Sequence, residues 1–255
     1  MGEEKYTIAE EFELPSKGLI YSKEVNPRVK LRSMTMRDEM KRTSRTDRPN
    51  MLLADIIEGC MVEKPAISVS DMCLGDFEYL LHKLRVVSQG ETYEMTGICP
   101  FCGEVTDVKV NLDEEQVLDF DLSKWEEMLT VKLPVCGKEV TLNYHTPRIV
   151  DTIKAKAEEM RKKSKESLDF EKLARLEESI NLVDGAKLSY IQKENFVKSL
   201  GVKDGQKILK RVEKLNGLVG LNSEIKFTCG KCGEEVLTFF RYTSEFFEPS
   251  DDEWW

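Results

Sequence analysis

Two short cysteine motifs carry the clearest chemistry in this sequence. They are Cys99-Pro-Phe-Cys102-Gly103 and Cys229-Gly-Lys-Cys232-Gly233, and each interrupts a stretch of residues typical of two β-strands. Glycine after the second cysteine suits a tight turn, because glycine tolerates a positive φ. Four thiolates form the tetrahedral ligand set that a structural Zn²⁺ prefers, with Zn–S distances of about 2.3 Å. The motifs therefore predict one structural Zn²⁺ per chain, bound by Cys99, Cys102, Cys229 and Cys232.

The separation of the two motifs is unusual for a zinc ribbon. Single ribbons separate their cysteine pairs by roughly 15–20 residues, whereas here residues 103–228 intervene. If one ion joins both motifs, this interval is an insertion whose two ends return to the same place. Two other interpretations stay open, namely unrelated surface turns with free thiols and a dithiol redox centre. A redox pair normally lies at a helix N-terminus near a βαβ pattern, but strand-like alternation follows Cys102, which favours zinc.

Composition and charge limit the classes of function. The 255 residues are 40% hydrophobic and 33% charged, as in a globular protein. A formal net charge of −9 argues against general nucleic-acid binding, which depends on clustered Lys and Arg. No apolar run approaches the roughly 18 residues that a membrane span requires, and no signal peptide is recognisable. We therefore expect no membrane, no nucleic acid and no small-molecule substrate among the partners.

The remaining cysteines suggest a reducing compartment. Four of the seven lie in the two motifs, which does not resemble a disulfide framework. We expect Cys60, Cys73 and Cys136 to pack as small apolar residues. Cys136 is followed by Gly137 and could alternatively serve as a spare ligand.

Motifs for catalysis are absent from the sequence. It contains no nucleophile elbow, no zincin helix, no Walker loop and no dinucleotide-binding glycines. The two histidines, His82 and His145, supply acid–base chemistry poorly, and we expect His82 to be solvated or hydrogen-bonded rather than a ligand. A zinc ion held by four thiolates also leaves no open position for water or substrate. We therefore predict that the chain is not an enzyme.

The patterns predict an α+β fold, with a zinc-ribbon-like β core that is interrupted by a β-hairpin and a helical insertion. The predicted segments are an extended N-terminal segment (1–34), a helical region (35–90), two ribbon halves (91–112 and 225–247), the insertion (113–224), and an acidic, aromatic tail (248–255).

Periodicity and capping residues set the expected helices. Thr35 and Asp38 cap a helix from Met36 to Thr43, a second helix covers 51–60, and a third region runs from 70 to 90. We expect Gly75 to break this third region and Asp76 to cap its longer half.

The insertion is expected to begin with a hairpin of strands 129–133 and 139–144. Four helices should follow it: 148–165, one with Leu173, Leu176, Ile180 and Val183 on its face, 190–200 capped by Ser189, and 206–215 after Asp204.

The order of several short motifs resembles a known family, the baseplate assembly and hub proteins of contractile-tailed, T-even-type bacteriophages. The motifs are Leu14-Pro-Ser-Lys-Gly18 with Tyr21, Val29–Leu31, Met34-Thr35, Asp38-Glu39, Leu74-Gly75-Asp76-Phe77, Leu80-Leu81, Leu84-Arg85, Gly90, Cys99-Pro-Phe-Cys102, Ile180–Gly185, the second Cys-x-x-Cys-Gly motif, and Phe246-Phe247. The resemblance implies a non-enzymatic structural or assembly protein that binds other phage tail proteins, located in the infected host's cytoplasm or in the tail baseplate of the virion.

We expect partners to contact two apolar segments, the turn Leu14–Tyr21 and the tail Phe246–Trp255, because both place apolar side chains where the chain has few neighbours to cover them. The alternative function is a zinc-ribbon adaptor in transcription or another nucleic-acid process. A third class, a thiol oxidoreductase, would require a reactive cysteine of low pKa.

Overall fold

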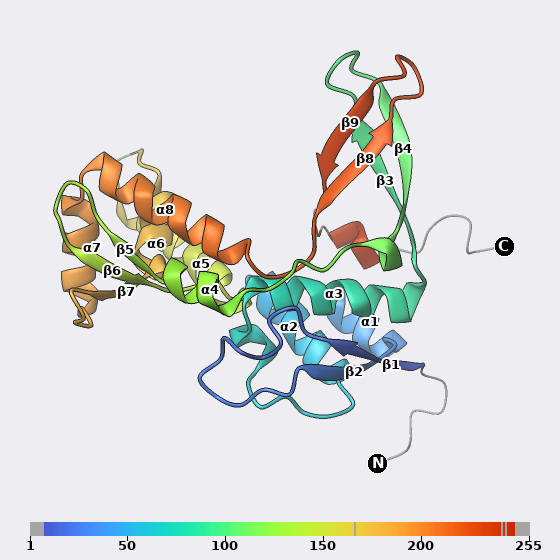
Figure 1. Cartoon of the computed structure of the whole chain (residues 1–255), viewed down its shortest axis with the longest axis horizontal. Helices are drawn as coiled ribbons and strands as arrows, with labels where there is room; N and C mark the ends of the chain where they lie inside the picture. Colours follow the sequence, from blue (N-terminus) through green and yellow to red (C-terminus); the bar gives the residue numbers. More distant parts are fainter. Residues whose placement is uncertain (1–7, 166, 241, 243, 248–255) are drawn as a thin grey trace.

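The computed structural model of the chain describes residues 8–165, 167–240, 242 and 244–247. It shows a mixed helix and sheet architecture, which confirms the predicted α+β class. Figure 1 shows three parts: a helical body around α3, an insertion to one side of it, and two long hairpins that project from the body. None of the helices in the described parts of the chain is long and apolar enough to cross a membrane.

Helix α3 (Leu74–Gln89) is the central helix of the body, and the other elements of the body lie around it. Strands β1 (Ala9–Glu13) and β2 (Arg28–Arg32) form an antiparallel pair, and α1 (Met36–Arg42), α2 (Pro49–Cys60) and the short η1 (Val69–Asp71) follow. The buried core joins Leu31 of β2, Ile57 of α2 and Leu80 of α3. The predicted cap of α1 is confirmed, because Thr35 and Asp38 form a reciprocal capping box.

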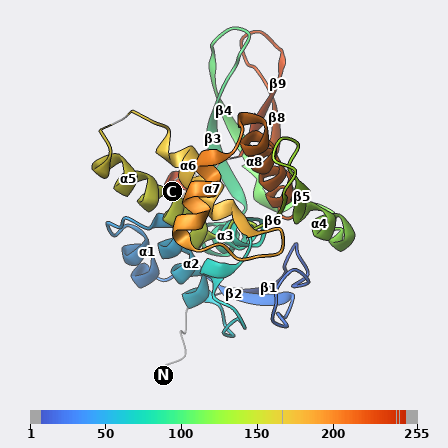
Figure 2. The ribbon, with the colours of Figure 1, turned by 90° about the vertical axis from the view of Figure 1, so that its left-hand side faces the viewer.

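Two antiparallel hairpins form what we call the double-hairpin arm. The first pairs β3 (Thr92–Ile98) with β4 (Val105–Asn111), and the second pairs β8 (Glu224–Thr228) with β9 (Glu235–Phe239). Figures 1 and 2 both show the two hairpins side by side, with their turns at the end farthest from the body. The short η2 (Leu112–Glu114) and η3 (Ser244–Phe247) lie at the base of the arm.

The insertion has its own sheet and its own core. Its elements are α4 (Leu122–Met128), β5 (Thr130–Lys132), β6 (Glu139–Leu142), α5 (Pro147–Lys163), α6 (Phe170–Ser179), β7 (Ile180–Val183), α7 (Tyr190–Ser199) and α8 (Val202–Asn216). The strands pair antiparallel in the order β5-β6-β7. Trp125, Val140 and Ile208 belong to a buried cluster separate from that of the body, so the insertion supplies most of its own packing.

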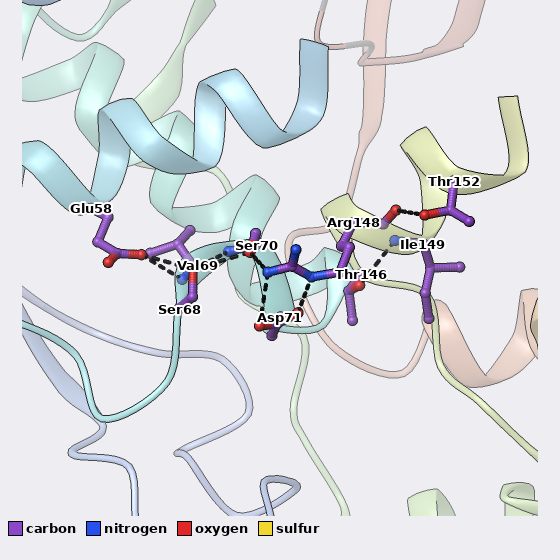
Figure 3. Close-up of polar contacts among 9 residues, drawn as sticks. All are labelled: Glu58, Ser68, Val69, Ser70, Asp71, Thr146, Arg148, Ile149 and Thr152. Carbon is purple, nitrogen blue, oxygen red and sulfur yellow. Dashed lines mark hydrogen bonds and ion pairs between the residues drawn. The ribbon is translucent and has the colours of Figure 1, made fainter. Parts of the chain in front are cut away.

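Polar contacts join the insertion to the body. Arg148, at the start of α5, forms a bidentate ion pair with Asp71 at 2.6 and 3.1 Å and also donates to the Ser70 hydroxyl (Figure 3). On the neighbouring turn of α5, buried Asp151 accepts from the Asn50 side chain at 2.7 Å and from the Met51 amide at 2.8 Å. Asp151 thus caps α2 from another element, which fixes the two parts against each other.

Four details differ from the sequence predictions. Helix α3 is continuous through Gly75, and its cap is Cys73 rather than Asp76, whose buried carboxylate instead accepts from the Ser16 amide and the Tyr21 hydroxyl. Helix α4 was not predicted. Ile180 and Val183 lie in β7 rather than in a helix, because β6 offers that segment a strand partner. Helix α8 begins at Val202, so that Asp204 lies inside it instead of preceding it.

Candidate metal centre

The two cysteine motifs form matching turns at the end of the double-hairpin arm. In the first, the Cys99 amide donates to the Glu104 carbonyl and the Gly103 amide to the Cys99 carbonyl, both at 2.9 Å. The second repeats this pattern between Cys229 and its partners at 2.9 and 3.0 Å. Gly103 and Gly233 have φ of +73° and +76°, the left-handed conformation for which glycine was predicted.

The arm brings all four sulfurs together. They lie within 4.8 Å of one another, with Cys99 to Cys232 and Cys102 to Cys229 each at 3.6 Å. Four sulfurs about 2.3 Å from one ion at tetrahedral angles would be separated by about 3.8 Å. The donor set therefore fits a metal ion that prefers thiolates. Cys99 and Cys229 are buried while the second cysteine of each motif is exposed, so the site lies just beneath the tip.

The backbone stabilises negative charge at the cluster. The amides of Cys232 and Lys231 point at the Cys229 sulfur and lower the pKa of that thiol to about 6. At Cys232 the Glu234 amide acts in the same direction, but desolvation and the neighbouring thiols outweigh it and raise the pKa to about 12. Four thiols this close cannot all ionise without a cation between them, whereas a metal ion would hold all four as thiolates.

Packing along the arm holds the hairpins in register with each other. A Cβ added at Gly97 of β3 would lie 2.5 Å from the Phe227 ring of β8, so this glycine allows the two hairpins to approach closely. At the base, Phe240 and Phe246 stack edge-on with Tyr93, with ring centroids 5.4 and 5.3 Å apart. The cysteines are thus brought together by long-range packing, which the sequence separation alone does not reveal.

Comparison with known proteins supports the family resemblance that the order of the motifs indicated. A family model described as T4 bacteriophage base plate protein matches residues 6–248, nearly the whole chain. The chain belongs to this family. The resemblance noted from the sequence is therefore confirmed, and membership points to a structural protein of the phage tail. No curated protein and no solved structure matches the chain.

This baseplate protein contains a third turn of the same shape. The sequence predicted the hairpin to which this turn belongs, but not the likeness of the turn to the other two. In the β5–β6 loop, the Leu133 amide donates to the Lys138 carbonyl at 2.8 Å and the Gly137 amide to the Leu133 carbonyl at 3.1 Å, with Gly137 at φ +72°. The shared letters Pro-x-Cys-Gly, at 100–103 and 134–137, are the signal that could have found it. Leucine stands here where the other turns have their first cysteine.

A carboxylate replaces the missing thiolate in this third turn. Asp204 of α8 accepts from the amides of Val135 and Cys136 at 2.9 and 3.0 Å, the positions whose counterparts point at the Cys229 sulfur. Cys136 is exposed and lies outside the sulfur cluster. The structure therefore does not support the alternative in which Cys136 is a spare ligand. Its predicted burial is wrong, whereas Cys60 and Cys73 are buried as expected.

Both histidines of the baseplate protein are buried and hydrogen-bonded. His82 contacts the Leu112 carbonyl through Nε2 at 2.8 Å, and His145 contacts the Ser179 hydroxyl at 3.1 Å. Burial lowers the pKa of each to about 4. His82 is thus hydrogen-bonded rather than a ligand, as expected.

The described parts of the two predicted contact segments are mostly buried or half-buried, although Leu19 in the first is 55% exposed. In the turn 14–21, Leu14 is 1% exposed and Ser16 is fully buried against Asp76. In the tail, Phe246 and Phe247 pack into the body, and the Phe246 carbonyl accepts from the buried Arg85 guanidinium at 3.0 Å. The expected exposure of Leu14, Phe246 and Phe247 is therefore wrong, because apolar residues far apart in sequence cover each other here. The remaining part of the predicted tail surface, 248–255, lies outside the described residues.

Proposed function

We propose that this chain is a non-enzymatic structural or assembly protein of a contractile phage tail baseplate, which binds other tail proteins and is stabilised by one Zn²⁺ at Cys99, Cys102, Cys229 and Cys232. The observation that carries the proposal is the family match over residues 6–248. The proposal includes a zinc-ribbon-like arm formed by 91–112 and 225–247, with 113–224 as an excursion from it. It also places the protein in the virion tail or in the host cytoplasm during assembly.

The end of the double-hairpin arm supports a role in binding proteins. Ile98 and Val105 face each other across the hairpin register, and Phe101 lies in the turn between them. All three are mostly exposed, with Phe101 at 66%. Aromatic and aliphatic side chains at an exposed tip suit the centre of a protein interface. A metal ion beneath this tip would hold the apolar residues in a fixed arrangement.

Metal content tests the first half of the proposal. Protein purified under reducing conditions should contain about one equivalent of Zn²⁺, and four thiols should resist alkylation until the metal is chelated. Structural zinc sites couple metal binding to folding, so chelation should also lower the unfolding temperature. Protein that is folded, reduced and free of metal would contradict the zinc centre but not the family membership.

Complementation tests the second half. A phage lacking this gene should assemble baseplates when the wild-type chain is supplied, and should do so poorly with Phe101→Ser. The matched control is Ile191→Ser on α7, an equally exposed apolar residue far from the tip. Normal assembly with Phe101→Ser would exclude the tip as an interface. Tight DNA binding that weakens steeply with salt would instead support the nucleic-acid adaptor.

A further inference from the structure

Helix α1 presents an unusual apolar surface. None of its residues is buried, and its two methionines, Met36 and Met40, are 75% and 71% exposed. Residues four apart lie on the same side of a helix, so these side chains form one continuous stripe. Methionine is flexible and polarisable, and exposed methionines are common on surfaces that bind other segments.

Positive charge surrounds this stripe. Arg37, Lys41, Arg45 and Arg48 are exposed on α1 and on the loop after it, and none of them forms an ion pair with a residue that the structure describes. The acids of α1 are already neutralised, because Asp38 pairs with Arg32 and Glu39 with Arg42. In a chain of net charge −9, this basic, methionine-containing surface is suited to an acidic segment with large apolar side chains.

The chain itself supplies such a segment next to this surface. The Phe247 ring lies 5.6 Å from the Arg42 guanidinium, and Arg85 holds the preceding carbonyl. Residues 248–255 therefore start from a fixed point beside α1. Their sequence, Glu-Pro-Ser-Asp-Asp-Glu-Trp-Trp, has four acids and no base, and it contains two of the three tryptophans in the chain.

We propose that the segment 248–255 docks on α1 of its own chain, with its carboxylates facing Arg37 and Lys41 and its tryptophans on Met36 and Met40. Eight extended residues reach about 26 Å, while the seven residues of α1 span about 10 Å, so the whole surface is within reach. Attachment at Phe247 gives the segment a local concentration on the order of millimolar, which favours its own chain over a second copy. Tryptophan can contact both methionine sulfur and arginine there.

Tryptophan fluorescence of the full chain tests this docking directly. Trp254 and Trp255 belong to the segment, whereas Trp125 is buried in the insertion and contributes a constant background. The wild-type protein should show blue-shifted emission and weak quenching by acrylamide. Arg37→Glu with Lys41→Glu should raise the quenching constant several-fold and shift the emission to the red. Met36→Ser with Met40→Ser should do the same without changing any charge.

The control and the rescue separate docking from general effects. Arg161→Glu with Lys162→Glu makes the same charge change at exposed positions of α5 and should leave quenching unchanged. Adding Asp251→Lys and Asp252→Lys to the double reversal on α1 should restore protection. Tryptophans that are already fully quenched in the wild type, or a reversal on α1 that changes nothing, would overturn the proposal. Protection that disappears on dilution would overturn it in favour of exchange between copies. Neither outcome bears on the zinc site or on baseplate assembly.

Discussion

Gly75 allows the chain to cross closely over α3 where it returns from the insertion to the double-hairpin arm. It lies in the first turn of α3, where the backbone of Val219 and Gly220 crosses the helix between α8 and β8. A Cβ at this position would lie 2.1 Å from the Val219 carbonyl oxygen and 2.9 Å from the Gly220 nitrogen. Both are backbone atoms, so no side-chain rotation can relieve the contact.

Two opposite effects determine what Gly75→Ala does. Alanine gains up to about 1 kcal/mol over glycine inside a helix. Ordinary contact begins near 3.4 Å, so the crossing backbone must retreat by more than about 1 Å. That movement strains the bond from the Leu118 amide to the Gly220 carbonyl. Overpacking of this kind costs up to about 3 kcal/mol, and the net result should be a loss of about 2 kcal/mol.

Thermal unfolding of a matched pair of variants measures this balance. Gly59 is also helical, but a Cβ there meets nothing within 4 Å. At about 2–4 °C per kcal/mol for a chain of this size, Gly75→Ala should lower Tm by about 4–8 °C, while Gly59→Ala should raise it by about 2–4 °C. If both substitutions raise Tm, the close crossing at α3 does not exist as described and the reasoning fails.

Three further predictions concern the metal centre, a histidine and a cap. Cys229→Ser should abolish zinc binding and lower stability by several kcal/mol, whereas Cys136→Ser should leave the metal content unchanged. His145 is neutral when folded, because burial lowers its pKa to about 4, and it takes up a proton near pH 6.5 when unfolded. As pH falls, the unfolded state therefore takes up this proton before the folded state does, and the free energy of unfolding decreases. In urea titrations, His145→Asn should reduce the loss of stability between pH 7 and pH 5 by up to about 2 kcal/mol. An unchanged loss would contradict the buried neutral state. Asp151→Ala should remove the cap of α2 and lower the free energy of unfolding by about 1–2 kcal/mol, and a variant as stable as wild type would show that the cap is dispensable.

Local features of the sequence predicted local features of the structure. The capping box of Thr35 and Asp38 needs only neighbouring residues, and so do the turns after Cys102 and Cys232. The start of α7 at Ser189 belongs to the same class, because its cap is completed by Gln192. In each case the donors and acceptors lie within a few residues, so chain chemistry fixes the geometry.

Features that depend on distant partners were not predictable in this way. Asp76 has the spacing of a helix cap, yet the fold uses its carboxylate to bind Ser16 and Tyr21. Ile180 continues a helical stripe, yet β6 pairs with it as a strand. In both cases the partner lies far away in the sequence, and the tertiary contact prevails over the local preference.

The sequence by itself determined which atoms are suited to a metal: four cysteines in two identical turns, with a glycine where each turn needs positive φ. Only the tertiary structure decided that these turns meet, because Gly97 lets the hairpins pack and the intervening insertion returns over Gly75. It also decided which apolar residues are available to partners, since Leu14 and Phe246 are buried while Phe101 is exposed. Ligand chemistry belongs to residue types and short spacings, whereas burial is a property of the whole packed chain.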